Sequence, residues 1–94
     1  MKFISLTKSP NPEKKYKIIF SEPSKTIHFG SKYSKTYLDH KDKNKREAYI
    51  ARHKVNEDWT EINAGSLSRF LLWGNSTSLK TNLSDYLKKF NIKK

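Results

Sequence analysis

The sequence predicts a small α+β domain in which an antiparallel sheet is followed by three helices. In the N-terminal third, polar and apolar residues alternate, which is typical of strands with one buried face. After residue 42 the apolar residues recur at helical spacing, and residues that cap helices precede two of the three runs. The 94 residues suit a single domain, 1–94, with a modest core to which the aromatic side chains contribute much.

The strand pattern is clearest in two runs that predict a β-hairpin. Residues 15–21 alternate cleanly, and residues 26–29 resume the alternation after a loop that contains Pro23. Gly30 closes the second run. The predicted inward side chains are Tyr16, Ile18, Phe20, Ile27 and Phe29, and the outward ones are Lys15, Lys17, Ile19, Thr26 and His28.

Two further segments are weaker strand candidates. Phe3, Ile4 and Leu6 give a short signal that stops at Ser9-Pro10-Asn11-Pro12, so residues 1–13 are expected to form a loosely attached strand or arm. Residues 34–38 are rich in Thr and Tyr and are a candidate third strand of the sheet.

Two of the three predicted helices begin with a capping residue, and the third is predicted from its apolar stripe. Asp42 is the expected N-cap of a helix over 43–55, and Asn63 caps a short apolar helix over 64–73 that ends at Gly74. The first helix has Ala48, Tyr49, Arg52 and Val55 near one face. The last helix has an apolar stripe of Leu79, Leu83, Tyr86, Leu87 and Phe90, and residues 91–94 are expected to be a basic tail.

Charge is the main functional signal in this chain, whose formal net charge is +11. Residues 1–35 carry +6, residues 36–62 are neutral, and residues 63–94 carry +5. Two basic segments around a neutral one are typical of a protein that offers a face to a polyanion, and nucleic acid is the first such partner to consider. The alternative is that an A+T-biased genome supplies Lys freely and that much of the excess is solvated surface.

The composition also bounds the compartment. The chain has no Cys, which excludes disulfides and thiolate metal sites and favours a reducing compartment. No apolar run is long enough for a signal peptide or a membrane span, so an intracellular, soluble protein that is not secreted is expected.

The candidate nucleic-acid contacts form three groups: the outward hairpin face with its ends, the basic segment between strand and helix that holds Tyr33 and Tyr37, and the lysines of the last helix. The outward hairpin face and its ends can reach phosphates, as ribbon-type DNA-binding proteins do, although an ordinary solvated sheet face has the same pattern. Tyr33 and Tyr37 are candidates for base stacking, with hairpin packing as the alternative. The predicted contact residues are Lys14, Lys15, Lys17, Lys25, His28, Lys32, Tyr33, Lys35, Tyr37, Lys80, Lys88 and Lys89.

Catalytic and metal-binding chemistry finds little support. The histidines lack the spacing of metal ligands, so a zinc site would need distant residues such as Asp39 or Glu47. No glycine-rich phosphate loop is present, and we expect a protein that is not an enzyme and uses no cofactor. Arg52 lies among apolar neighbours on its helix and is expected to have a structural role, with Glu57, Asp58 or Glu61 as its partner.

A series of short motifs in residues 14–91 resembles a family of small uncharacterised basic proteins encoded by nucleocytoplasmic large DNA viruses, the mimivirus and phycodnavirus relatives. The motifs are Thr26-Ile27-His28-Phe29-Gly30, Tyr33-Ser34, His40-Lys41-Asp42, Tyr49-Ile50-Ala51-Arg52-His53, Glu57-Asp58-Trp59, Ala64-Gly65, Leu67-Ser68-Arg69, Leu72-Trp73, Ser78-Leu79-Lys80, Tyr86 and Lys88-Lys89-Phe90. This chain departs from the family pattern at Phe70, where the family has Trp or Tyr, and at Gly74-Asn75.

The resemblance implies a setting, which is the cytoplasmic factory of an infected cell or a virion that packs a large DNA genome. With the charge, it predicts a non-enzymatic, largely sequence-nonspecific DNA-binding protein in genome packaging or compaction. Duplex DNA is the first expected partner and RNA the second, with other virion proteins as further partners. The alternative is a virion structural or host-interaction protein without a nucleic-acid role.

Overall fold

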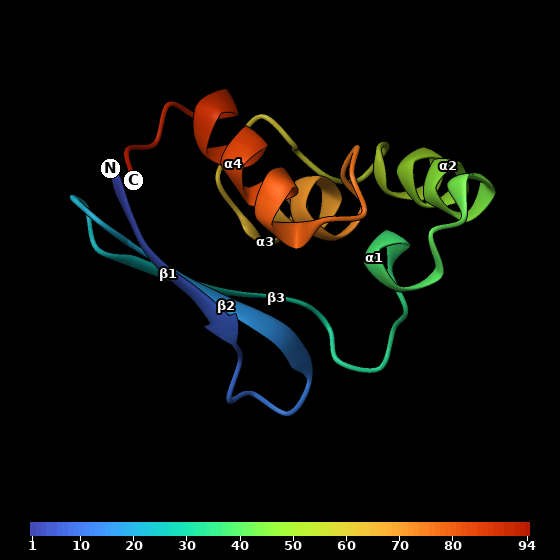
Figure 1. Cartoon of the computed structure of the whole chain (residues 1–94), viewed down its shortest axis with the longest axis horizontal. Coiled ribbons are helices and arrows are strands. Elements are labelled where there is room, and N and C mark those ends of the chain that lie inside the picture. Colours follow the sequence, from blue (N-terminus) through green and yellow to red (C-terminus); the bar gives the residue numbers. More distant parts are fainter.

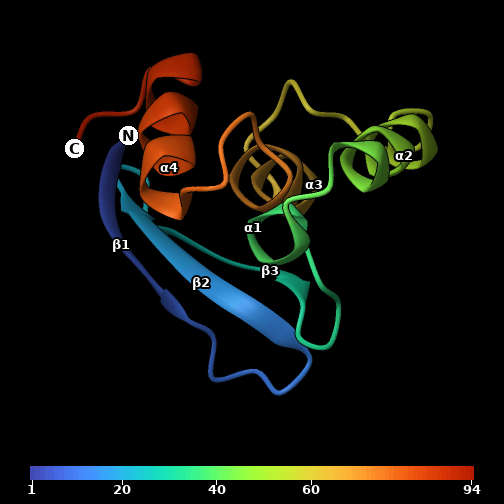
Figure 2. The ribbon, with the colours of Figure 1, turned by 45° about the vertical axis from the view of Figure 1, so that its right-hand side comes forward.

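The computed structural model describes residues 1–94 and confirms the α+β class, with a three-stranded antiparallel sheet followed by helices. The strands lie in the order β1 (Lys2–Lys8), β2 (Lys14–Ser21) and β3 (Lys25–Ser31). The helices are α1 (Tyr37–His40), α2 (Lys43–His53), α3 (Ala64–Leu67), η1 (Ser68–Leu72) and α4 (Leu79–Lys89). Figures 1 and 2 show the helices on one side of the sheet, so the fold has two layers and the other sheet face is uncovered.

The predicted hairpin forms with the predicted sides. Tyr16 pairs with Phe29 and Ile18 with Ile27, so the apolar side chains of both strands share the face that meets the helices. Gly30 has φ +80°, and a Cβ there would come 2.7 Å from the Leu72 side chain. A glycine therefore lets the end of β3 approach η1 closely.

The third strand is β1, and the prediction of a strand over 34–38 is wrong. β1 pairs with β2 from Lys2, opposite Ser21, to Lys8, opposite Tyr16, so these residues are an integral edge strand and not a loosely attached arm. Near residues 34–38 the chain instead starts α1. There the Asp39 carboxylate accepts the backbone N–H of Thr36 at 2.7 Å, a contact that also lowers the pKa of Asp39 and favours a helix start over an extended strand.

The C-terminal residues are held against the sheet, which corrects the expectation of a basic tail over 91–94. Ile92 is only 7% exposed and belongs to the core. The backbone N–H of Phe3 donates to the Lys93 carbonyl at 2.7 Å, and the N–H of Lys93 donates to the Met1 carbonyl at 3.2 Å. An apolar residue between polar neighbours thus anchors both chain ends side by side, as Figure 1 shows.

The core lies between the sheet and the layer of α3, η1 and α4. Asn63 and Ser78 cap α3 and α4 through their side-chain oxygens, which accept backbone N–H groups of the first helical turn. A Cβ at Gly74 would clash with the Phe70 carbonyl oxygen, so glycine is needed where η1 ends. The buried apolar residues are Ile18, Phe20, Phe29, Leu67, Leu71, Leu72, Tyr86, Leu87 and Ile92.

Helix α2 differs from its predicted packing. It ends at His53 instead of Val55, and of the four residues predicted near one face only Tyr49 is buried. Ala48 and Arg52 are exposed, and Val55, beyond the helix, is 78% exposed. The helix has a weak apolar periodicity, so polar and aromatic contacts position it instead of an apolar stripe.

Tyr86 makes the core sensitive to alkaline pH. Its side chain is 1% exposed and its hydroxyl lies 2.8 Å from that of Ser66, and burial raises the pKa of Tyr86 to about 12. Above pH 10 an unfolded tyrosine loses its hydroxyl proton, whereas Tyr86 in the folded protein keeps it. The contribution of Tyr86 to the free energy of unfolding is therefore complete below pH 10 and is lost as pH rises towards 12. Between pH 10 and pH 12, the free energy of unfolding of Tyr86→Phe should therefore fall by roughly 2 kcal/mol less than that of the parent protein.

Urea denaturation at a series of pH values measures this difference. Tyr33→Phe is the matched control, because the Tyr33 side chain is 87% exposed. Equal pH dependence of all three proteins would show that Tyr86 is not the group responsible.

Candidate nucleic-acid interface

The uncovered face of the sheet carries basic and hydroxyl side chains and no carboxylate from its paired positions. Lys17 lies on the central strand β2 with Thr7 of β1 on one side and His28 of β3 on the other. The next row is Ser5, Ile19 and Thr26 in the same order. We call these six residues together with Lys15 the outer sheet face.

Two contacts order the basic groups of the outer sheet face. The His28 Nδ1 lies 2.7 Å from the Ser9 hydroxyl, and because Ser9 follows β1 while His28 is on β3, this hydrogen bond crosses the central strand. The ammonium group of Lys15 donates to the carbonyl of Lys32 at 3.5 Å. The Lys17 ammonium has neither a hydrogen bond nor an ion pair within the protein, so it remains available to an anion.

Two of the predicted contact residues are placed elsewhere. Lys25 pairs with the inward residue Phe20, and its ammonium donates to the Ile62 carbonyl at 3.1 Å, on the helical side of the sheet. Tyr37 is 6% exposed in α1, where the Arg46 guanidinium lies 5.7 Å from its ring centroid. Tyr37 therefore cannot stack on a base, because a helix start and not a strand occupies this segment.

A cleft of about 810 Å³ lies where loop 32–36 faces α2 and α3, and no residue of the outer sheet face lines it. Three predicted contact residues, Lys14, Tyr33 and Lys35, are among its lining residues. Arg52 and His53 of α2 line it too, although the sequence assigned them no binding role. Only the folded arrangement brings these segments together, so no local sequence signal marks this cleft.

A stack of aromatic rings ends in the cleft. Tyr49 lies between Trp73, at 4.3 Å between ring centroids, and His53, at 4.1 Å. His53 Nδ1 forms a short hydrogen bond with Glu57, whose other carboxylate oxygen accepts the indole N–H of Trp59 at 2.9 Å. These contacts occupy Glu57, so it cannot serve as the partner predicted for Arg52.

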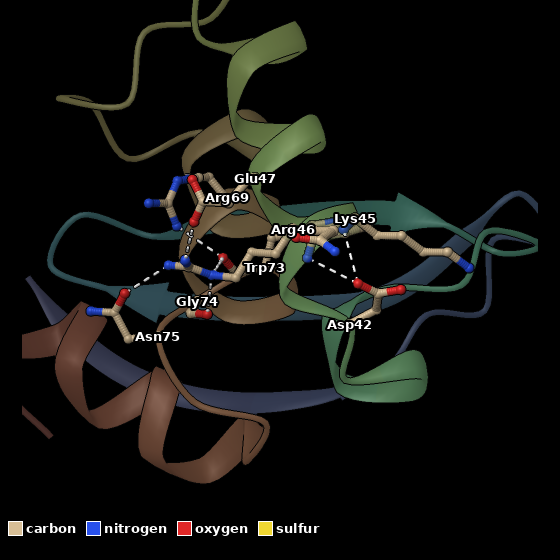
Figure 3. A network of polar contacts seen from close by, with 9 residues as sticks. Asp42, Lys45, Arg46, Glu47, Arg69, Trp73, Gly74 and Asn75 are labelled. Carbon is tan, nitrogen blue, oxygen red and sulfur yellow. Dashed lines mark hydrogen bonds and ion pairs between the residues drawn. The ribbon is translucent and has the colours of Figure 1, made fainter.

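The structural arginine of α2 is Arg46 instead of Arg52, which corrects the prediction. Arg46 Nε donates to the carbonyls of Gly74 at 2.8 Å and Trp73 at 3.2 Å, and a terminal nitrogen donates to Asn75 at 2.7 Å (Figure 3). Its partners are carbonyls at the end of η1, and a cation is favourable beside the C-terminal end of a helix. Arg52 is exposed and has no hydrogen bond or ion pair with its side chain.

The last four predicted contact residues belong neither to the outer sheet face nor to the lining of the cleft. Lys32 is exposed in the loop after β3, where its backbone N–H donates to the Glu13 carbonyl. Lys80 and Lys88 lie on α4, and the Lys89 ammonium lies 4.9 Å from the Phe70 ring centroid. Because α4 belongs to the helical layer, its lysines lie on the opposite side from the outer sheet face (Figure 2). One flat surface cannot contact both groups at once.

Residues 4–53 match the sequence profile of a family of unknown function, DUF5754, and this span is more than half of the chain. The chain belongs to the DUF5754 family. The region matched by the DUF5754 profile runs from β1 through α2, so it includes the outer sheet face, loop 32–36 and Arg52, but not α3, η1 or α4. No curated protein and no solved structure matches the chain.

Two further observations limit the kinds of site in this DUF5754 chain. None of its helices has the length and apolar character that crossing a membrane requires. No three His, Asp or Glu side chains come together in a way that would hold a metal ion.

Proposed function

We propose that this protein is a non-enzymatic, largely sequence-nonspecific DNA-binding protein of a large DNA virus, which acts in genome packaging or compaction. The observation that carries the proposal is the outer sheet face, an uncovered sheet surface with Lys15, Lys17 and His28 and no paired carboxylate. Duplex DNA presents two rows of phosphates, and basic and hydroxyl side chains on a twisted sheet are suited to contact them.

Two of the three arginines form hydrogen bonds within the protein, which supports low sequence specificity. Guanine is read most often by the two-pronged hydrogen bonding of arginine in the major groove. The chain has three arginines, and Arg46 and Arg69 both donate to main-chain carbonyls inside the protein. Contact by lysine ammonium groups neutralises phosphates as point charges and does not select a base.

The viral setting rests on the resemblance of the short motifs to a family of proteins encoded by large DNA viruses. A virion or a cytoplasmic virus factory is the location that this resemblance favours. A basic protein without sequence preference suits such a location, because a large genome must be neutralised along its whole length.

A salt titration of binding tests the proposed function. Unrelated DNA duplexes should bind with similar affinity, and if about five phosphates are neutralised, the slope of log affinity against log salt should be about −4 to −5. Fluorescence anisotropy with labelled DNA and RNA duplexes measures both the slope and the preference.

A slope near zero, or no duplex binding at about 50 mM salt, would contradict the electrostatic proposal. It would favour the alternative, a virion structural or host-interaction protein. The exposed Ile4 in edge strand β1 is the feature that such a protein contact would use, since it is 56% exposed.

A further inference from the structure

The cleft between loop 32–36, α2 and α3 has the charge of an anion-binding site. Its lining includes Lys14, Lys35 and Arg52, and none of these three cations forms an ion pair within the protein. Two carboxylates also line the cleft. Glu57 is hydrogen-bonded to His53 and Trp59, and the three cations outnumber the two carboxylates.

The cleft also offers aromatic rings beside these cations. Tyr33 is 87% exposed at its rim, and its side chain has no hydrogen-bond partner in the protein. On the opposite wall the stack of Trp73, Tyr49 and His53 ends at His53, whose side chain is 38% exposed. An aromatic ligand between these walls can therefore meet a ring while its charged groups meet the cations.

We propose that this cleft binds single-stranded nucleic acid, with an unpaired base on Tyr33 and its flanking phosphates on Arg52 and Lys35. Rings on concave walls can be reached by a base only when it is not paired and stacked within a duplex. The cleft volume of about 810 Å³ lies within the range of sites that enclose small ligands. This site is separate from the outer sheet face and does not depend on the proposed duplex binding.

The aromatic contact is tested with a labelled oligothymidylate, which forms no duplex. Tyr33→Ala should weaken its binding by roughly tenfold, since stacking of one base on an aromatic side chain has about that effect. Tyr33→Phe keeps the ring and should bind like the parent protein. Fluorescence anisotropy measures both, and duplex binding of the same variants should be unchanged.

The phosphate contact is tested by Arg52→Gln, with Lys54→Gln as the matched control. Both residues are exposed and both changes remove one positive charge, but only Arg52 lines the cleft. Arg52→Gln should reduce the single-strand salt slope by about 0.7, the expected effect of losing one phosphate contact. Lys54→Gln should leave the slope unchanged.

Tryptophan fluorescence locates the bound strand independently of affinity. Trp73 lines the cleft and Trp59 does not, so in a Trp59→Phe variant the oligothymidylate should quench the remaining emission.

Three results would overturn the assignment: unchanged single-strand affinity of Tyr33→Ala, equal slopes for Arg52→Gln and Lys54→Gln, or no quenching of Trp73 at saturation. Loss of duplex binding alone would instead overturn the proposed function and leave this site intact.

Discussion

Replacing Lys15 and Lys17 together by glutamate is expected to weaken duplex DNA binding by about a hundredfold at low salt, because two phosphate attractions become repulsions. The salt slope should also become shallower by about 2. The fold should survive, since the inward residues Ile18 and Phe20 are untouched and Lys15 makes only a 3.5 Å contact with the Lys32 carbonyl. Anisotropy titrations across salt measure the binding, and circular dichroism checks the fold.

The matched control is Lys43→Glu with Lys45→Glu. It changes the net charge by the same amount on exposed positions of α2, which Figure 1 shows away from the sheet. Glutamate is also favourable in the first turn of a helix, so this variant should fold. A control that weakens binding as much as the outer-face variant would mean that only net charge matters and that the outer sheet face is not the contact surface.

Replacing Arg46 by alanine is expected to destabilise the protein by about 2–4 kcal/mol, because a largely buried guanidinium is lost and the Gly74 carbonyl is left unsatisfied, while Arg69 still donates to the Trp73 carbonyl. The Arg46 side chain is 15% exposed and joins α2 to the carbonyls of Trp73 and Gly74. Arg46→Lys should recover little of the loss, since one ammonium group cannot reproduce the forked contacts. Urea denaturation measures the free energy of unfolding.

Arg52→Ala is the control for this prediction and should change the free energy of unfolding by less than about 0.5 kcal/mol. Both arginines lie on α2, but Arg52 is exposed and unpaired. A larger effect of Arg52→Ala than of Arg46→Ala would reverse the two assignments.

The contacts that hold α2 in place also position one wall of the proposed cleft. Arg46 and the ring stack of Tyr49 on Trp73 join α2 to the residues at the end of η1. Arg52 and His53 line the cleft from the same helix. Arg46→Ala should consequently also lower single-strand binding, although Arg46 does not line the cleft.

The sequence by itself determined the fold class, the hairpin and the starts of α2 and α3. Alternation in residues 15–21 and 26–29 is a local property of the chain, and it assigned the two sides of the hairpin correctly. The caps at Asp42 and Asn63 are equally local, because each side chain accepts a backbone N–H within three residues. The basic character of the chain is likewise independent of its folding.

Only the tertiary structure decided which residues share a surface. Local alternation cannot say whether residues 2–8 or 34–38 complete the sheet, since pairing with β2 settles that question. Arg46 and Arg52 look alike on their helix, but the partners of Arg46 lie 27 to 29 residues further along the chain. The Lys25 ammonium donates to the Ile62 carbonyl, and the cleft is lined by loop 32–36 together with α2 and α3. In both cases the partners are distant in sequence, so no local pattern could predict the contact.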